Sequence, residues 1–361
     1  MLEAVPSYLT GYQNVYHENP RRAARKWFEN ARYGLFLHWG LFSKYGESCP
    51  YLYDNDDVSI PEYKKTMAEF DAASFDAAAI TNLALDAEMA YITFVCRHHD
   101  GFSLWDTAQS EFKSTNAAAE RDFVEELADE CQKKELGLFL YYSYGLDWTH
   151  PAFPTDESGI ARAPERFEGH HTWNPGDNNG EYVAFVHEQL RELLTDYGPI
   201  AGVWFDPISS YYQRPDLFPV HETYGLVRSL QDHCLVAYKN GATGTEDFVT
   251  PEQRLHDEAL QWLDRGRMSE LRKAEIRANW TRQLQGATEF CATLEDDWGY
   301  TPETDRLSCE EVLDLLAYAT TRDANVLLNT APKFDGSIHS ASERILRDVG
   351  EHIRANGWPR G

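Results

Sequence analysis

The stretch that decides the fold of this chain is Gly202-Val203-Trp204-Phe205-Asp206-Pro207. A run of β-branched and aromatic residues that is apolar on both faces predicts a short strand buried in a parallel sheet. Pro207 ends the run, so Asp206 lies where the strand gives way to a loop. In a parallel α/β barrel that end of the strand is where catalytic groups collect, and a carboxylate there can attack a sugar carbon. A lone aspartate at this point can equally well cap the next element.

Further short apolar runs occur on both sides of this strand. They cover residues 33–38, 91–96, 137–142, 235–238, 288–294 and 325–329. Helical patterns lie between them, at residues 20–30, 61–89, 120–134, 181–197, 308–322 and 340–355. Alternating strands and helices predict a parallel sheet. The best fit is an α/β fold of the irregular (β/α)8-like (TIM-type) barrel class, with a doubly wound open sheet as the alternative.

The composition excludes several classes of partner. Acidic residues outnumber basic ones by 59 to 33, which gives a formal net charge of −26. A surface this negative disfavours nucleic acid, anionic membranes and polyanionic substrates, and it suits a neutral substrate. Aromatic residues make up 13% of the chain. Their rings can stack on sugars, although core packing also explains them.

The spacing of the cysteines and the N-terminal residues indicate the cellular compartment that we expect for this protein. The six cysteines are Cys49, Cys96, Cys131, Cys234, Cys291 and Cys309. None belongs to a Cys-x-x-Cys pair, so we expect buried thiols and neither a disulfide framework nor a zinc site. Residues 1–10 lack the pattern of a signal peptide, and no apolar stretch approaches membrane-spanning length. We therefore expect a cytoplasmic protein, with a homo-oligomer possible.

Polar residues that can bind a ligand follow four of the predicted strands. They are His38 with Trp39, His98 with His99 and Asp100, Tyr142 with Ser143, and Trp204 with Asp206. Because the carboxyl ends of parallel strands meet at the same end of a barrel, we expect these groups to converge at one mouth.

His38, His98 and His99 also allow the interpretation that this end of the barrel binds a metal ion. Histidines and an aspartate at barrel strand ends are typical of metal-dependent hydrolases. Adjacent residues on an extended chain point to opposite sides, however, so His98 and His99 cannot both bind one ion without a turn. The chain also has no His-x-His or His-Glu-x-x-His motif. We expect no metal and no cofactor, and histidines that hydrogen-bond to ligand hydroxyls.

Seven motifs, in order along the chain, resemble those of the α-L-fucosidases of glycoside hydrolase family 29. They are Ala31-Arg32-Tyr33-Gly34-Leu35-Phe36-Leu37-His38-Trp39-Gly40, His98-His99-Asp100-Gly101-Phe102, Tyr141-Tyr142-Ser143 with Asp147-Trp148, Trp204-Phe205-Asp206, Asp247-Phe248-Val249-Thr250-Pro251-Glu252, Trp298-Gly299-Tyr300, and Asn325-Val326-Leu327-Leu328-Asn329 with Asp335-Gly336. Each motif is weak by itself, but seven in the family's order make a specific pattern.

The resemblance implies a retaining exo-glycosidase for terminal α-L-fucosides, built on an irregular barrel. Asp206 resembles the family's nucleophile, and Glu252 resembles the acid/base of one branch. The residues that resemble the family's sugar pocket are His38, His98, His99, Tyr142 and Trp204, together with Trp39. Lys239 or Asn240 lies near the position of a site arginine in that branch. Many members continue into a C-terminal β-sandwich. We expect none here, and we expect residues 1–361 to form one catalytic domain.

The assignment of the second carboxyl group has alternatives. Glu252 could simply be an acid at a helix start, since it directly follows Pro251. Its rivals are Glu246 and Glu289, and Glu289 is expected on a strand. The acid must be protonated before it can donate to the leaving oxygen, so we expect burial or the charge of Asp206 to raise its pKa.

The chain departs from the family in the loop after Gly40, where a Glu-Trp pair usually contacts the sugar. The loop reads Gly46-Glu47-Ser48-Cys49-Pro50-Tyr51-Leu52-Tyr53 instead, and Glu47, Tyr51 or Tyr53 could substitute. This keeps open a related sugar, such as an α-L-galactoside or a modified fucoside, or a catalytically silent carbohydrate-binding relative. Residues 1–32 are expected to form a lead-in and residues 253–285 a helical insertion.

Overall fold

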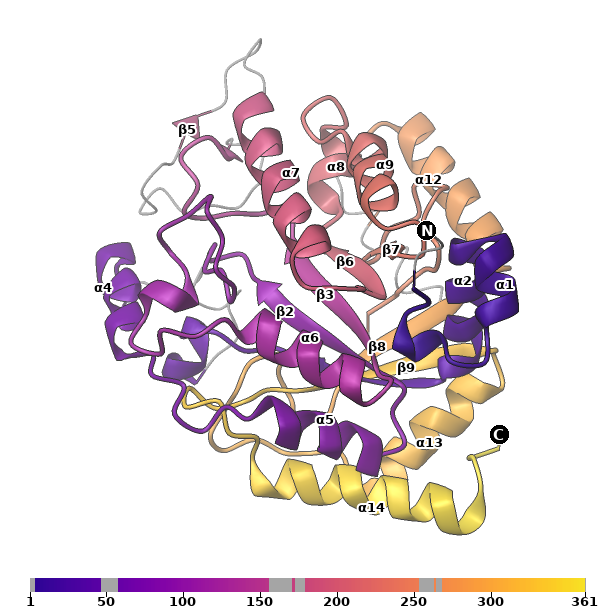
Figure 1. Ribbon diagram of the computed structural model, residues 1–361. Coiled ribbons are helices and arrows are strands. Elements are labelled where there is room, and N and C mark those ends of the chain that lie inside the picture. Colours follow the sequence, from indigo (N-terminus) through magenta and orange to yellow (C-terminus); the bar gives the residue numbers. More distant parts are fainter. Residues whose placement is uncertain are drawn as a thin grey trace.

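The computed structural model describes residues 4–46, 58–155, 171–172, 179–252, 263 and 268–360. At the centre lies a curled sheet of seven parallel strands in the order β7-β6-β3-β2-β1-β9-β8 (Figure 1). The strands are β1 (Tyr33–Leu37), β2 (Tyr91–Arg97), β3 (Gly137–Ser143), β6 (Gly202–Asp206), β7 (Leu235–Tyr238), β8 (Thr288–Thr293) and β9 (Ala324–Thr330). Nearly every residue in these strands is buried, because helices cover the outer face and side chains fill the inside.

Helices surround this sheet and join its strands. Those that follow β1 are α4 (Ile60–Lys65), α5 (Ala77–Asp86), α6 (Phe123–Lys133), α7 (Gly180–Thr195), α8 (Ser209–Gln213), α9 (Val220–Leu230), α12 (Glu270–Gln283), α13 (Cys309–Thr320) and α14 (Ser340–Asn356). A small separate pair, β4 (Pro154–Thr155) with β5 (His171–Thr172), lies between β3 and α7. None of the helices in the described ranges is long and apolar enough to cross a membrane.

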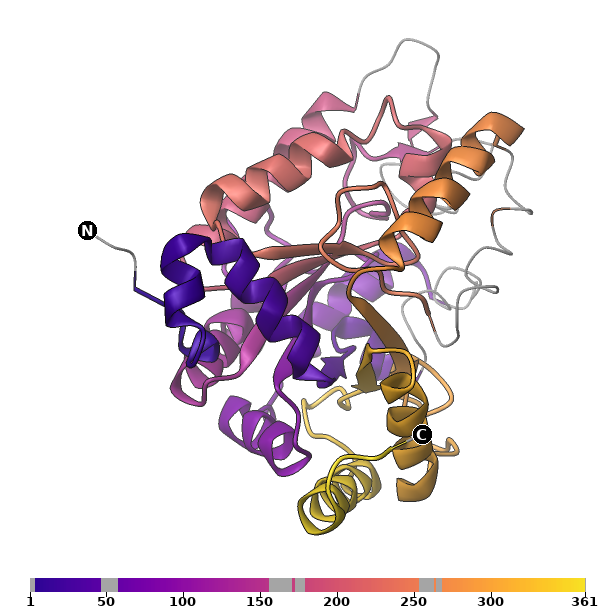
Figure 2. The same cartoon turned by 90° about the vertical axis from the view of Figure 1, so that its right-hand side faces the viewer.

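The N-terminal helices close the end of the barrel at which the strands begin (Figure 2). They are α1 (Gln13–Glu18) and α2 (Pro20–Ala31), and the Asn19 side chain caps α2 through the backbone N–H of Arg22. Phe28 of α2 packs against the rings of Tyr91 and Phe139, with centroids 5.7 and 5.6 Å away. The opposite end is left for polar side chains.

An irregular segment, residues 249–252, fills the gap between β7 and β8. The backbone hydrogen bonds that hold it run from Glu289 N to Val249 O (2.9 Å), from Cys291 N to Pro251 O (3.3 Å) and from Asn240 N to Thr250 O (3.1 Å). Pro251 has no N–H to donate, so the ladder is broken and the segment is not a regular strand. It occupies the eighth position of the barrel and carries Glu252 to the same end as Asp206.

The sequence-based fold is therefore confirmed as an irregular, parallel (β/α)8-like barrel. Each of the seven predicted strands is present within one or two residues. The helical pattern at residues 61–89 is divided into α4 and α5, with a short 3-10 helix and the expected break near residue 70 between them. Cys96, Cys131, Cys234 and Cys291 are buried free thiols. Cys49 lies outside the described residues.

Candidate active site

Asp206 lies at the C-terminal end of β6 and is only 4% exposed. Its Oδ2 accepts a hydrogen bond from the Tyr141 hydroxyl at 2.8 Å. The same oxygen is 3.6 Å from His99 Nε2 and 3.8 Å from Lys239 Nζ. Tyr141 and His99 come from β3 and from the end of β2, and Lys239 directly follows β7. The strand ends thus converge on one carboxylate, as the barrel requires.

Glu252 lies beside it, at the end of the irregular eighth segment. Its Oε2 is 3.0 Å from Lys239 Nζ, and its Oε1 accepts a hydrogen bond from Trp298 Nε1 at 2.8 Å. One ammonium group therefore contacts both carboxylates. The facing oxygens of Asp206 and Glu252 can be no farther apart than the sum of these two Lys239 distances, about 7 Å, a limit that admits the ~5–5.5 Å of retaining glycosidases.

The two carboxyl groups differ in their electrostatic environment. Burial raises the pKa of Asp206, although Lys239 and the Tyr141 hydroxyl oppose the rise. Burial also favours the neutral form of Glu252, but Lys239 and the hydrogen bonds from Trp298 and Asn240 outweigh it and lower its pKa. The expectation of a raised pKa for Glu252 is thus wrong, because the Lys239 ammonium lies only 3.0 Å from its carboxylate.

The hydrogen bonds of His38 fix the proton of its imidazole. Asn329 Nδ2 donates to the Trp298 carbonyl at 2.9 Å, which leaves Asn329 Oδ1 to accept from His38 Nδ1–H at 2.7 Å. His38 Nε2 then carries a lone pair. Burial lowers the pKa of His38 to about 3, so the ring is neutral. The side chain is therefore an acceptor for a ligand hydroxyl.

The same argument applies to His99. Ser143 Oγ donates to the Leu146 carbonyl at 2.6 Å and accepts from His99 Nδ1–H at 2.6 Å, so His99 Nε2 also carries a lone pair. Burial, reinforced by Lys239, lowers its pKa well below the ordinary value. His98 stacks on the Tyr141 ring with centroids 5.2 Å apart, and burial lowers its pKa as well. The three neutral imidazoles suit an uncharged ligand that presents several hydroxyl donors.

The sequence also allowed a metal site formed by His38, His98 and His99. Among the residues that the structure describes, no group of three or more His, Cys, Asp or Glu side chains is placed to hold an ion.

Two aromatic residues expected in the pocket lie elsewhere. Tyr142 points to the outer face of β3, where its hydroxyl donates to Gln189 Oε1 of α7 at 2.6 Å. Its neighbour Tyr141 faces Asp206 instead. Trp39 is fully buried, donates to the Lys333 carbonyl at 2.8 Å and stacks on Phe75. These two predictions are wrong, because both side chains belong to the outer packing layer.

Trp204 occupies an intermediate position. Two residues before Asp206, it points to the same inner face but one layer deeper. Its ring stacks on Tyr141 with centroids 5.4 Å apart, and its Nε1 donates to Glu289 Oε1 at 3.0 Å. Trp204 thus underlies the site and is almost wholly covered, at 1% exposed.

The rival acids are both committed to other contacts. Glu246 accepts hydrogen bonds from Tyr224 and from Gln283 of α12, each at 3.0 Å. Glu289 is 1% exposed, and burial raises its pKa to about 7 against the effect of its hydrogen bonds. The loop residues Glu47, Tyr51 and Tyr53 lie outside the described residues, as do residues 253–262 and 264–267 of the 253–285 insertion. The described part of the insertion contains α12.

Sequence reasoning missed three residues of this site. Tyr141, Trp298 and Asn329 touch Asp206, Glu252 and His38 respectively. Each one lies in a motif that the sequence analysis quoted. The missing information was the direction in which each side chain points.

The contrast between Tyr141 and Tyr142 gives a first prediction. Tyr141→Phe removes the hydrogen bond to Asp206, so we expect kcat/KM for an aryl glycoside to fall about 10-fold, the effect of losing one hydrogen bond to a charged group. The limb of the pH profile that reports Asp206 should move to higher pH, because that hydrogen bond lowers the pKa of Asp206.

Tyr142→Phe is the matched control on the adjacent residue. It loses only the hydrogen bond to Gln189, so we expect lower thermal stability with unchanged kcat/KM. If instead Tyr142→Phe loses activity while Tyr141→Phe does not, the orientation of β3 is wrong.

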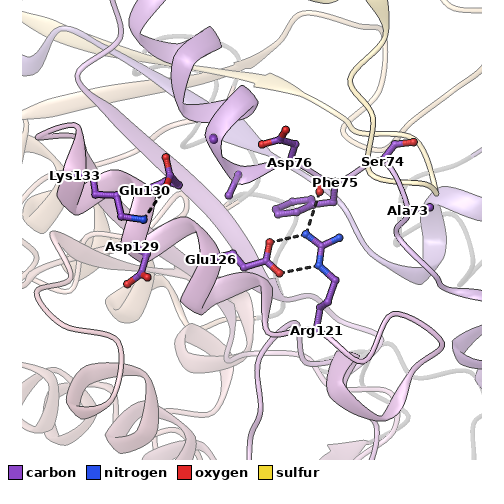
Figure 3. Close-up of a pocket in the computed structure, with 11 residues that line it drawn as sticks. Ala73, Ser74, Phe75, Asp76, Arg121, Glu126, Asp129, Glu130 and Lys133 are labelled. Atoms are coloured by element: carbon purple, nitrogen blue, oxygen red, sulfur yellow. Dashed lines mark hydrogen bonds and ion pairs between the residues drawn. The ribbon is translucent and has the colours of Figure 1, made fainter.

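Another hollow lies on the outer surface between α5 and α6 (Figure 3). Its central cation, Arg121, is bound to Glu126 through two nitrogens and also donates to the carbonyls of Ala72 and Phe75. Lys133 is likewise paired with Glu130 at 2.9 Å. Both cations that line this hollow are thus paired within the chain, which leaves neither of them available to bind an anionic ligand.

Comparison with known proteins gives a consistent result. The family model described as alpha-L-fucosidase matches residues 4–358. The plasma alpha-L-fucosidase of Rattus norvegicus is 26% identical over an alignment of 367 positions, which covers 96% of this chain and 72% of that protein.

Solved structures agree. Alpha-L-fucosidase isoenzyme 1 from Paenibacillus thiaminolyticus has 28% sequence identity and a TM-score of 0.74, and the match covers 94% of this chain and 77% of that one. The unliganded alpha-L-fucosidase AlfC from Lactobacillus casei has 25% identity and a TM-score of 0.69, with 92% and 99% covered.

Proposed function

This chain belongs to the α-L-fucosidase family, and from that premise we propose that it hydrolyses terminal α-L-fucosides with retention of configuration. In this mechanism Asp206 is the nucleophile and Glu252 is the acid/base. The observation that supports it best is Lys239, whose Nζ lies 3.8 Å from Asp206 Oδ2 and 3.0 Å from Glu252 Oε2. One ammonium group in contact with both carboxylates keeps them within about 7 Å of each other, a range that includes the ~5–5.5 Å of double displacement.

In the first step, an Asp206 oxygen attacks the anomeric carbon on the face opposite the leaving oxygen. Glu252 gives its proton to that oxygen as the carbon–oxygen bond breaks. Asp206 is then esterified to the sugar, and the alcohol departs. His38 Nε2 and His99 Nε2 can each accept a hydrogen bond from a sugar hydroxyl and so hold the ring in place.

In the second step, the ionised Glu252 takes a proton from water. The resulting hydroxide attacks the anomeric carbon and displaces Asp206, so the two inversions give net retention. The Lys239 ammonium stays near both carboxylates and balances whichever one carries the negative charge.

A panel of nitrophenyl glycosides tests the proposed substrate. We expect release of nitrophenol from the α-L-fucoside, and little from β-fucoside, α-galactoside or β-glucoside. Faster release from an α-L-galactoside would assign the related sugar instead. An inactive protein that still binds fucose would indicate a carbohydrate-binding role.

The pH dependence of the reaction gives a second prediction. The active form has Asp206 ionised and Glu252 protonated, so kcat/KM is bell-shaped in pH and its two limbs report the pKa values of these two groups. Lys239 lowers both of these pKa values. A neutral Lys239→Gln variant should therefore shift both limbs of the bell-shaped profile to higher pH.

Lys239→Arg is the matched control, because it keeps the positive charge. Its profile should stay close to that of the wild type, even if its maximum rate falls. A Lys239→Gln profile that does not move, measured as kcat/KM over the full pH range, would show that Lys239 does not control these carboxyl groups.

A further inference from the structure

Glu289 is a buried carboxyl group that the double-displacement mechanism does not use. It lies on β8, and its side chain points to the inside of the barrel at 1% exposure. Its Oε2 accepts from the Tyr91 hydroxyl at 2.6 Å. Its Oε1 accepts from Trp204 Nε1 at 3.0 Å and from Thr250 Oγ1 at 3.2 Å. Three donors from three other segments thus meet at one side chain.

The position of these donors connects Glu289 to the site above it. Trp204 is two residues before Asp206, and Thr250 is two residues before Glu252. Side chains two residues apart on an extended chain point the same way, so Glu289, Trp204 and Thr250 form the layer directly beneath the two reacting carboxyl groups. The backbone agrees, because Glu252 pairs with Cys291, which is two residues after Glu289.

A second path leads from Glu289 to Asp206. The Trp204 ring stacks on Tyr141 with centroids 5.4 Å apart and planes 27° apart, and the Tyr141 hydroxyl donates to Asp206 Oδ2. Glu289 therefore holds the ring that supports the hydrogen-bond donor of Asp206. The segment that carries Glu252 has no regular ladder at Pro251, so the Thr250 contact is an additional anchor for it.

We propose that Glu289 is a positioning residue that fixes the separation of Asp206 and Glu252 by joining Trp204 and Thr250 through one carboxylate oxygen. The inference rests on the proposed function, since it assigns both carboxyl groups to the reaction. It also gives Glu289 a different role from that of the acid/base, for which the sequence analysis named it as an alternative to Glu252. A retaining site depends on this separation, and a displacement of about 1 Å can cost about 10²-fold in rate.

The test compares substitutions that keep or remove the acceptor oxygen. Glu289→Gln keeps an oxygen for Trp204 and Thr250 and turns an amide toward the Tyr91 hydroxyl, which can accept from it. We expect this variant to retain a kcat close to that of the wild type. Glu289→Leu leaves the donors unpaired, and we expect kcat to fall about 10²-fold with little change in KM.

The dependence on the leaving group distinguishes positioning from acid catalysis. Because Glu289 positions Asp206 as well as Glu252, Glu289→Leu should lose activity with nitrophenyl α-L-fucoside too. Glu289→Gln keeps both contacts, so it should stay close to the wild type with nitrophenyl and with unactivated methyl α-L-fucoside. A loss in Glu289→Gln that is far larger for the methyl glycoside would make Glu289 the acid and overturn the proposal.

Glu192 of α7 provides a matched control on the outside of the barrel. It also accepts three hydrogen bonds, from Trp105 Nε1 at 3.2 Å, from Ala108 N at 3.0 Å and from Gln109 Nε2 at 3.1 Å. Glu192→Leu should lower thermal stability while leaving kcat unchanged. An equal loss of kcat in Glu192→Leu and Glu289→Leu would mean a general loss of fold, and would overturn a specific role for Glu289.

Thr250→Val gives an independent measurement if Glu289→Leu does not fold. It keeps the shape of the side chain and removes a single donor to Glu289. We expect kcat to fall about 10-fold for both substrates, the effect of one hydrogen bond to a charged group. If Thr250→Val has wild-type kcat while Asp206→Gly is inactive, the proposed function stands and the role of Glu289 is refuted. If Asp206→Gly is also fully active, the proposed function itself fails.

Discussion

Asp206→Gly should lower the kcat for nitrophenyl α-L-fucoside by about 10⁴-fold, because it removes the group that forms the covalent intermediate in the proposed mechanism. Tyr141, His99 and Lys239 remain in place around the vacated position. The variant should therefore fold and still bind the sugar, with a circular dichroism spectrum and a melting temperature near those of the wild type.

Azide tests whether Asp206→Gly loses activity because the nucleophile is missing or because the fold is damaged. Glycine leaves room for an external anion, so azide should restore part of the rate by attacking the anomeric carbon directly. One displacement replaces two, and the product should be the fucosyl azide of inverted configuration. Near-normal activity without azide would show that another carboxyl group is the nucleophile.

Glu252→Ala is expected to have the second large effect, and that effect should depend on the leaving group. An unactivated fucoside needs a proton on its leaving oxygen, so its kcat/KM should fall about 10²–10⁴-fold, the usual size of a general-acid contribution. A nitrophenyl fucoside needs little protonation, so its first step should survive. Deglycosylation loses its base, hence the intermediate should accumulate and the apparent KM should fall.

Azide also distinguishes the two variants. In Glu252→Ala it should attack the covalent intermediate from the side that Glu252 occupied, which gives a fucosyl azide of retained configuration. A Glu252→Ala variant with equal losses for both substrates and no azide product would not fit an acid/base. Glu246→Ala is the control for a nearby buried glutamate, since Glu246 is bonded to Tyr224 and Gln283.

The sequence was sufficient for the strands and for the place of Asp206 at a strand end, because short apolar runs bounded by turn residues are typical of buried parallel strands. The sequence could not show to which face of the sheet each side chain points. A strand buried on both faces has no alternation of polar and apolar residues, so Tyr141 and Tyr142 look equivalent. The structure separates them, with Tyr141 on Asp206 and Tyr142 on Gln189.

The environment of Glu252 was also beyond the sequence. A proline argues against a strand, so Pro251 kept residues 249–252 from being predicted as the eighth strand of the barrel. The backbone hydrogen bonds to β8 and Asn240 show that this segment continues the barrel. The lowered pKa of Glu252 depends on the distance to Lys239, which no motif encodes. The prediction that Trp39 lines the pocket failed for a related reason. The sequence cannot tell whether an aromatic residue next to a site histidine faces the pocket or packs against the surrounding helices.

The measurement that tests the central claim most directly is covalent trapping with 2-deoxy-2-fluoro-α-L-fucosyl fluoride. The fluorine at C2 slows both displacements, while the fluoride leaving group keeps the first one fast enough for the intermediate to accumulate. Peptide mass spectrometry of the inactivated protein should find one added fluorofucosyl group, attached to Asp206. A label on Glu252 or Glu289, or turnover with inversion and no label, would contradict a retaining mechanism with Asp206 as the nucleophile.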